Sequence, residues 1–204
     1  MQGSIGVPTE YTQATMPSAS AVASGTRVYN STYGIYLRSN GTRWIAMSPF
    51  TVDQGTRSDV VTGAIAESLM HSVDISDAVR YMGPRGRMRI VGGWTFPNTA
   101  NAKNLRIRIG TSAGISGTQY MISASSGTGN SMADKTIFAN GSESSQLSSS
   151  ASSLGTATSG SFVTSALNCA PGGDNVVVSF TSAPVGAGEI VTFNSYSVMI
   201  YPGY

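Results

Sequence analysis

Charged side chains, cysteine and histidine are all scarce in this sequence of 204 residues. Asp, Glu, Lys and Arg together make up 11% of it, against roughly 25% in ordinary globular domains. One cysteine, Cys169, and one histidine, His71, are present. A single thiol excludes an intrachain disulfide framework, and these counts exclude cysteine-rich and multi-histidine metal sites. We therefore expect no metal and no other cofactor.

Long apolar runs are also missing. No segment approaches the ~20 apolar residues that a membrane helix needs, and the N-terminal residues do not combine a basic and an apolar part as a secretory leader does. The formal net charge of +2 is close to neutral, which argues against nucleic acid as the main partner. We expect neither nucleic-acid binding nor membrane insertion.

Glycine, serine and threonine replace the missing charges, and this composition favours strands and turns over helices. The clearest pattern lies between Gly86 and Gly110. In an extended chain, alternate side chains share a face. Apolar residues therefore alternate with arginines in two segments, Arg87-Met88-Arg89-Ile90 and Leu105-Arg106-Ile107-Arg108-Ile109.

These two segments predict an antiparallel strand pair with one apolar and one basic face. The apolar face needs a second sheet to cover it. About eight strands, separated by Gly, Asn and Pro clusters, follow one another over residues 59–204. We therefore predict an all-β protein whose main domain is an antiparallel, jelly-roll-like β-sandwich.

Three local predictions follow for this domain. Residues 60–75 form a long strand, with a helix over 64–70 as the alternative. Separate strands lie at 118–124, 136–139, 145–152, 161–167, 176–181 and 189–201. In the last of these, the alternation of apolar residues shifts by one across Asn194-Ser195, which predicts a β-bulge.

The N-terminal part divides into three. Residues 1–24 contain too little apolar surface to fold alone, so we expect an extended arm that packs on a partner chain or acts as a linker. Residues 25–48 predict a small β-hairpin module, with Asn40-Gly41 as its strongest turn signal. Residues 49–58 are expected to be a linker. A module of this size is marginal alone and would gain from association with copies of itself.

The residues available for catalysis are few. His71 lies four residues after Glu67, but no Gly-x-Ser-x-Gly nucleophile motif is present. Cys169 has no basic neighbour that would lower its pKa, so we expect a buried, inert thiol. Asp74 and Asp77 are expected to be turn residues rather than a catalytic pair. We therefore expect no enzymatic activity.

The best binding candidate is the basic face made by Arg87, Arg89, Arg106 and Arg108. Four guanidinium groups on adjacent strands repel one another, so an anion should lie close by. That anion is Glu67 or Asp74 on a neighbouring strand, an acid of another subunit, or an anionic glycan bound by the paired N–H groups of arginine. Trp94, Phe96, Tyr120 and Tyr204 either stack on sugar rings or belong to the core.

Two short motifs of the N-terminal module stand out, Ser24-Gly25-Thr26-Arg27-Val28-Tyr29 and Leu37-Arg38-Ser39-Asn40-Gly41-Thr42-Arg43-Trp44. Further motifs follow at Gly83-Pro84-Arg85-Gly86, Trp94, Lys103–Gly110 and Tyr196-Ser197-Val198. In this order they resemble the short β-module and the terminal domain of bacteriophage tail fibres and related virion appendages. The resemblance implies a homotrimer that belongs to the virion and contacts the bacterial surface through its outer domain.

The sequence thus predicts a structural virion protein, a trimeric tail fibre whose C-terminal sandwich binds a glycan of the host cell surface. The N-terminal arm would join it to other virion proteins. The alternatives are a capsid-attached head fibre, a decoration or baseplate protein without receptor binding, and a spike enzyme that degrades glycans.

Overall fold

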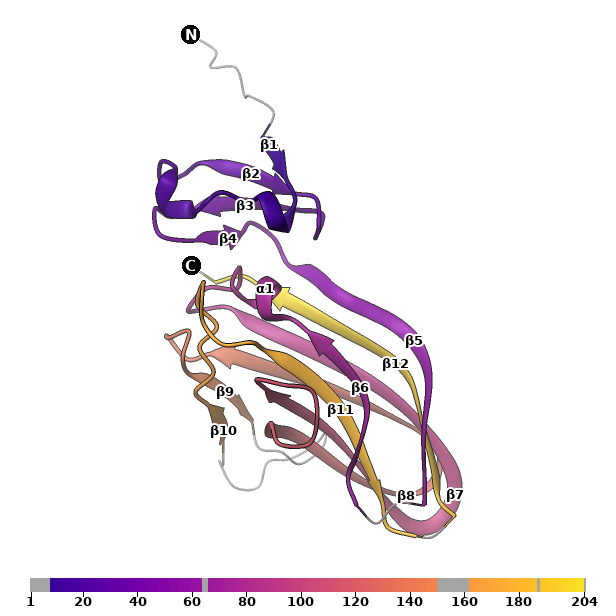
Figure 1. Cartoon of the computed structure of the whole chain (residues 1–204). Coiled ribbons are helices and arrows are strands. Elements are labelled where there is room, and N and C mark those ends of the chain that lie inside the picture. The colour runs from indigo at the N-terminus through magenta and orange to yellow at the C-terminus, as the bar shows by residue number, and fades with distance from the viewer. Residues whose placement is uncertain (1–7, 64–65, 150–161, 187, 204) are drawn as a thin grey trace.

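The computed structural model describes residues 8–63, 66–149, 162–186 and 188–203, and it is built almost entirely of strands. Two units follow one another along the chain, a small sheet and a larger β-sandwich (Figure 1). Within the described residues, the one α-helix is α1 (Ser76–Val79), and none of the helices is long and apolar enough to cross a membrane.

The small sheet has four strands in the order β1 (Thr9–Tyr11), β2 (Arg27–Asn30), β3 (Ile35–Ser39) and β4 (Trp44–Ala46). β3 alternates strictly between buried and exposed residues, as a strand with one covered face must. β3 and β4 form the predicted hairpin. Asn40-Gly41 opens its loop, where the Asn40 side chain accepts hydrogen bonds from the amides of Thr42 and Arg43.

The expectation of an arm over residues 1–24 is wrong for its described part. β1 pairs in parallel with β2, and two short 3-10 turns, Gln13–Thr15 and Ala19–Ala21, follow it. Polar contacts hold this segment on the sheet: Trp44 Nε1 donates to the Pro17 carbonyl at 2.7 Å, and Ser39 Oγ donates to the Ala19 carbonyl at 3.0 Å. Partners within the same chain therefore order a segment whose few apolar residues suggested that it could not fold. Residues 1–7 lie outside the described part.

In its described part the sandwich contains eight strands, as expected. They are β5 (Phe50–Thr62), β6 (Ser68–Asp74), β7 (Arg87–Gly110), β8 (Thr118–Ala139), β9 (Gln146–Ser149), β10 (Phe162–Ser165), β11 (Val177–Pro184) and β12 (Ile190–Tyr201). Hydrogen bonds join them into one continuous sheet in the order β10-β9-β8-β7-β11-β6, and β12 pairs with both β7 and β5.

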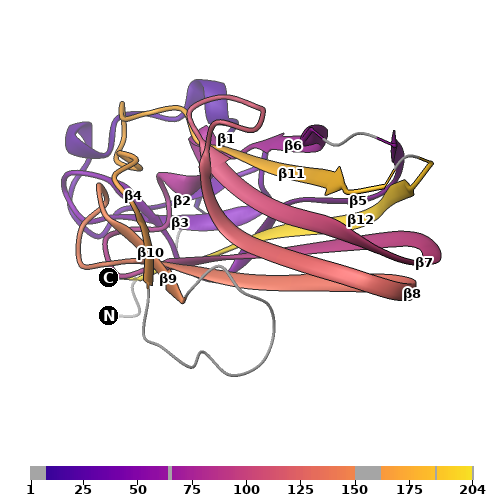
Figure 2. The same cartoon turned by 90° about the horizontal axis from the view of Figure 1, so that it is seen from below.

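This sheet becomes a sandwich because β7 and β8 fold over together at the end of the molecule away from the small sheet (Figures 1 and 2). The first half of β7, residues 87–95, pairs with β12, and its second half, residues 103–110, pairs with β11. The register of the β7–β8 pair shifts twice between Phe96 and Lys103, where the strands bend. One layer contains the first half of β7, and the other contains its second half.

The two halves of β7 therefore do not pair with each other, and the expected pair with one apolar and one basic face is wrong. Their apolar sides instead meet across the sandwich. Trp94 and Phe193 of the first layer pack on Phe180 of the second layer, with ring centroids 6.2 and 4.7 Å away. Met88, Ile90, Leu105, Ile107 and Ile109 are at most 2% exposed.

The segments 118–124 and 136–139, expected as separate strands, are the two ends of β8.

The β-bulge predicted at Asn194-Ser195 is confirmed, because the pairing of β12 with both neighbours shifts between Phe193 and Ser195. The expected linker over residues 49–58 is wrong, since residues 50–58 belong to β5. β5 is an edge strand, paired only with β12, and most of its side chains are exposed. An edge strand with little buried surface carries no apolar alternation from which it could be predicted. The long strand expected over 60–75 is divided between β5 and β6; residues 64–65 and 150–161 lie outside the described part.

The two units are joined by aromatic and backbone contacts around Tyr81. Its carbonyl accepts the amide of Ala46 at 3.1 Å, its hydroxyl accepts from Asn30 at 3.2 Å, and its ring meets that of Tyr33 edge-on. Beside it, Gly83 has a φ of +77° and approaches Gly203 so closely that a Cβ at Gly83 would lie 2.4 Å from the Gly203 oxygen. Glycine is therefore required where the chain end meets this turn.

The core gives a direct test of this layering. Val198 on β12 is fully buried, whereas Val60 on the neighbouring strand β5 is 54% exposed. We expect Val198→Ala to lower the free energy of unfolding by about 2 kcal/mol, since two buried methyl groups are lost and a cavity remains. Val60→Ala should change it by less than about 0.5 kcal/mol. Urea denaturation of both variants checks this, and equal losses would contradict the assignment of the inner face.

Candidate functional site

The four predicted arginines occupy two separate places. Arg87 and Arg89 lie in the first half of β7, and Arg106 and Arg108 lie in its second half. The inward residues of the two halves face each other, so the arginines point outward on opposite sides of the sandwich. A single basic face is therefore wrong, and any role of these residues in receptor or intersubunit contact remains a prediction for each pair separately.

Arg106 and Arg108 converge on Glu67, one of the anions considered from the sequence. Arg108 donates from Nε and Nη2 to the two carboxylate oxygens at 2.6 and 2.7 Å, and Arg106 Nη1 lies 3.0 Å from the carboxylate. The Thr181 hydroxyl on β11 donates to the same carboxylate. The three charged side chains are only 13–16% exposed. This cluster fastens the segment before β6 to the outer face of the second layer.

The pKa of Glu67 reflects this arrangement. Burial raises it, but the hydrogen bonds from Arg108 and Thr181 and the charges of both arginines outweigh burial and leave the pKa below its ordinary value. Arg108 also donates to the Gly117 carbonyl at 2.9 Å, in the loop after β7. The guanidinium donors of Arg108 are thus used within the chain.

Arg87 and Arg89 differ from each other. Arg89 makes a paired contact with Asp134 on β8, with Nε at 2.9 Å from Oδ1 and Nη2 at 2.5 Å from Oδ2. The hydrogen bonds from Arg89 lower the pKa of Asp134. Arg87 lies over the ring of Tyr201, 4.7 Å from its centroid, and it has no carboxylate partner in the described part of the chain. Of the four arginines, Arg87 is therefore the one left with its charge unpaired.

A buried ion pair at the bend of β7 was missed by the sequence reasoning. Lys103 Nζ lies 3.3 Å from Glu189 Oε2, and the two side chains are 0% and 3% exposed. Thr99 and Asn101 both donate to Glu189 Oε1, and these hydrogen bonds are the main cause of its lowered pKa. The signal was present, because Lys103 has the same alternation phase as the buried Leu105, Ile107 and Ile109.

His71 and Cys169 do not form a catalytic pair. The ring of His71 packs between Phe180, Phe193 and Tyr196, and burial followed by the charge of Arg57 lowers its pKa. Cys169 is buried, as predicted, and burial raises its pKa to about 12. No contact joins the two in the described part of the chain. A thiol with this pKa is protonated at neutral pH and is a poor nucleophile.

The acids also serve local structure. Asp74 accepts hydrogen bonds from the backbone and side chain of Ser76 at the start of α1, and Asp77 pairs with Arg80 at 3.0 Å. Among the described residues, no three His, Cys, Asp or Glu side chains are grouped as metal ligands. Trp94, Phe96 and Tyr120 are at most 6% exposed and belong to the core rather than to a sugar-binding surface; Tyr204 lies outside the described part.

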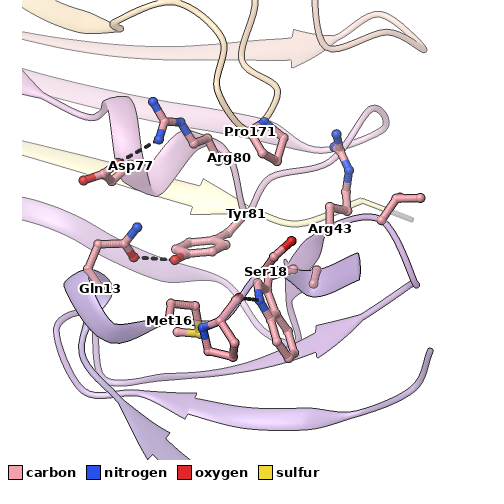
Figure 3. A pocket seen from close by; sticks show the side chains of 12 residues that line it. Gln13, Met16, Ser18, Arg43, Asp77, Arg80, Tyr81 and Pro171 are labelled. Atoms are coloured by element: carbon pink, nitrogen blue, oxygen red, sulfur yellow. Dashed lines mark hydrogen bonds and ion pairs between the residues drawn. The ribbon is translucent and has the colours of Figure 1, made fainter. Parts of the chain in front are cut away.

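A cavity of about 210 Å³ opens where the small sheet meets the sandwich. Figure 3 shows its walls, with Arg80 and Tyr81 from the sandwich opposite Met16 and Ser18 from the small unit. Arg43 reaches from the small unit to Glu143 of the sandwich and forms an ion pair. Tyr81 donates to Gln13. Because these polar groups pair with one another across the cavity, it is chiefly part of the contact between the units.

Comparisons with known proteins give few matches. No family model matches the chain, and no curated protein matches it. Solved structures of the infectious bursal disease virus protein VP2 show a weak likeness. A VP2 subviral particle is 15% identical with a TM-score of 0.30, covering 84% of this chain and 49% of VP2. VP2 in T=1 particles is 14% identical with a TM-score of 0.30, covering 87% and 48%. The chain spans about half the length of these VP2 chains, and a likeness this weak carries no argument about function.

The cluster around Glu67 predicts a dependence of stability on pH. The folded carboxyl is more acidic than in the unfolded chain, so the unfolded chain takes up protons first as the pH falls. The contribution of the cluster is thus complete above the ordinary pKa of 4.5 and is lost as the pH falls through the lower folded value. Glu67→Gln should cost about 1–2 kcal/mol at pH 7, since the cluster is mostly but not fully buried.

Urea midpoints measured from pH 7 down to pH 3 check this prediction. The urea midpoint of the wild-type chain should fall toward the acid end of this range, and Glu67→Gln should make this fall less steep. Asp59→Asn is the control, because its ion pair with Arg57 is more exposed and should contribute less. An equally steep fall of the urea midpoint in the wild type and in Glu67→Gln would contradict the stabilising role assigned to the Glu67 cluster.

Proposed function

We propose that the chain is a structural protein of a bacteriophage particle, a trimeric fibre whose sandwich contacts the host cell surface. The observation that carries this proposal is the arrangement of two β-units end to end. β1 lies at one end of the molecule, and the bend of β7 and β8 lies at the other (Figure 1). Such a shape suits a protein that is attached at one end and presents the other.

The junction between the units supports a stiff rod rather than two units on a tether. The chain passes from β4 (ending at Ala46) to β5 (beginning at Phe50) with few residues between them. Tyr81 and the Arg43–Glu143 ion pair fix the units relative to each other. A stiff connection holds the outer unit in a constant direction, as surface attachment through several copies requires.

Association in copies fits the small unit. Its four strands are each at most five residues long, and a sheet of this size buries little surface alone. Three copies would cover surface that one chain leaves exposed, and they would strengthen weak glycan contacts by multivalency. The end of the molecule that carries β1, opposite the bend, is the natural place for attachment to other virion proteins.

The proposed role requires no chemical turnover. His71 is enclosed by aromatic rings, Cys169 is buried with a raised pKa, and the acids named from the sequence pair with arginine or with local backbone. One alternative is a capsid or baseplate decoration that assembles in the same way but binds no receptor. The two roles differ only in whether the free protein competes for host cells.

Two measurements test the proposal on the full chain. Multi-angle light scattering at micromolar concentration should give three times the mass of one chain. Purified protein, added in excess, should then reduce adsorption of the particle that carries it. A trimer that leaves adsorption unchanged would support the decoration role and overturn receptor binding. A monomer at micromolar concentration would overturn the trimeric fibre.

A further inference from the structure

The exposed face of the small sheet carries charges that have no partner among the described residues. Arg27 on β2 lies directly opposite Arg38 on β3, and Tyr29 lies opposite Tyr36. Like charges placed directly opposite across a strand pair destabilise the pair. Neither arginine makes a hydrogen bond or ion pair in the described part of the chain, and both are exposed. The face therefore gains from an external negative charge.

The same face also carries an unpaired negative charge. Glu10 on β1 is in register with Tyr29, so its side chain shares the face with the two tyrosines. Glu10 is exposed and has no ion-pair partner within the described residues. We call the group Glu10, Arg27, Tyr29, Tyr36 and Arg38 the tyrosine face. Its acid stands at one edge of the sheet, and Arg38 stands two strands away.

Exposed apolar residues continue from the tyrosine face onto the sandwich. The amide of Met47 donates to the Tyr36 carbonyl at 2.9 Å, and Met47 is 39% exposed. Met47 also lines a shallow groove of about 260 Å³ together with Arg87 and Tyr201. Arg87, the arginine without a carboxylate partner, is thus placed at the boundary between the two units.

Exposed aromatic and apolar residues continue from this boundary across the first layer of the sandwich. Arg87 is in register with Phe138 on β8, Phe138 with Leu147 on β9, and Phe162 on β10 lies diagonally next to Leu147. Phe138 is 46% exposed and Phe162 is 64% exposed. Neighbouring exposed aromatic and apolar side chains mark an interaction surface, whereas single ones do not. We call Met47, Tyr201, Phe138 and Phe162 the apolar extension.

We propose that the tyrosine face and the apolar extension together form the surface on which a second copy of this chain docks. Glu10 of one copy lies against Arg38 and Arg27 of the next. This inference rests on the proposed function and names the interface of the trimer. A second copy fits because it supplies both missing charges at once and spans both units.

The placement of the charges also fits a closed ring. In a cyclic trimer each contact is heterologous. Glu10 of one copy can therefore meet Arg38 of the next copy, while its own Arg38 meets Glu10 of the third. Glu10 and Arg38 occupy different strands of the same face, which is the separation that such a contact needs. An anionic glycan would satisfy the arginines, but it would leave Glu10 repelled and the apolar extension uncovered.

A charge exchange between Glu10 and Arg38 tests the interface on the full chain. Arg38→Glu and Glu10→Arg should each weaken association about tenfold or more, measured as the dissociation constant by sedimentation equilibrium. The double variant, which exchanges the two charges, should restore most of the affinity. Arg57→Glu is the matched control, because it reverses an exposed arginine on β5, outside this surface, and should leave association unchanged.

The outcomes separate this inference from the proposed function. A wild-type oligomer that neither single variant weakens would overturn the interface while leaving the fibre proposal intact. Single variants that weaken association without restoration in the double variant would overturn the contact of Glu10 with Arg38. A wild-type monomer would overturn the trimer itself. Circular dichroism and melting curves of all variants ensure that a loss of association is not a loss of folding.

Discussion

The bend shared by β7 and β8 is the constraint on which the rest of the structure depends. Because both strands fold over together, one continuous hydrogen-bonded sheet covers its own apolar side. Residues from the two halves of β7 enter the same core, where Trp94 meets Phe180 and Phe193. Hydrophobic burial is the main favourable contribution to folding, and here it requires a strand of 24 residues to bend back on itself.

The bend also explains where the charges lie. It places Lys103 inside the sandwich, where Glu189 and Thr99 supply the partners that a buried charge needs, and Asn101 donates to Glu189 in turn. It directs Arg87 and Arg89 to one outer face and Arg106 and Arg108 to the other. Three of these four arginines then find a carboxylate in the same chain. These charges therefore help to hold the fold together.

The charges left over lie mainly near the small sheet. Glu10, Arg27, Arg38 and Arg87 stand beside tyrosines, Met47 and phenylalanines, on a surface that extends across both units. This concentration of unpaired charge and exposed aromatic surface is the physical reason to treat the chain as one part of a larger assembly. It also links the marginal size of the small sheet to its proposed role, since neighbouring copies can supply the burial that its short strands lack.

The sequence by itself determined the local features whose causes are local. Period-2 alternation predicted strands, and Asn40-Gly41 predicted the loop of the β3–β4 hairpin. The shift in alternation at Asn194-Ser195 predicted a bulge, and the lack of basic neighbours predicted an inert Cys169. Tertiary structure alone decided the features that depend on distant partners. β5 is held by β12 although most of its side chains are exposed, the segment from β1 to Ala21 is ordered by contacts with the sheet, and the arginines are divided by a bend. Alternation records which side of a strand is covered, but not which strand covers it, so the sequence predicted a sandwich without showing that one strand forms both of its layers.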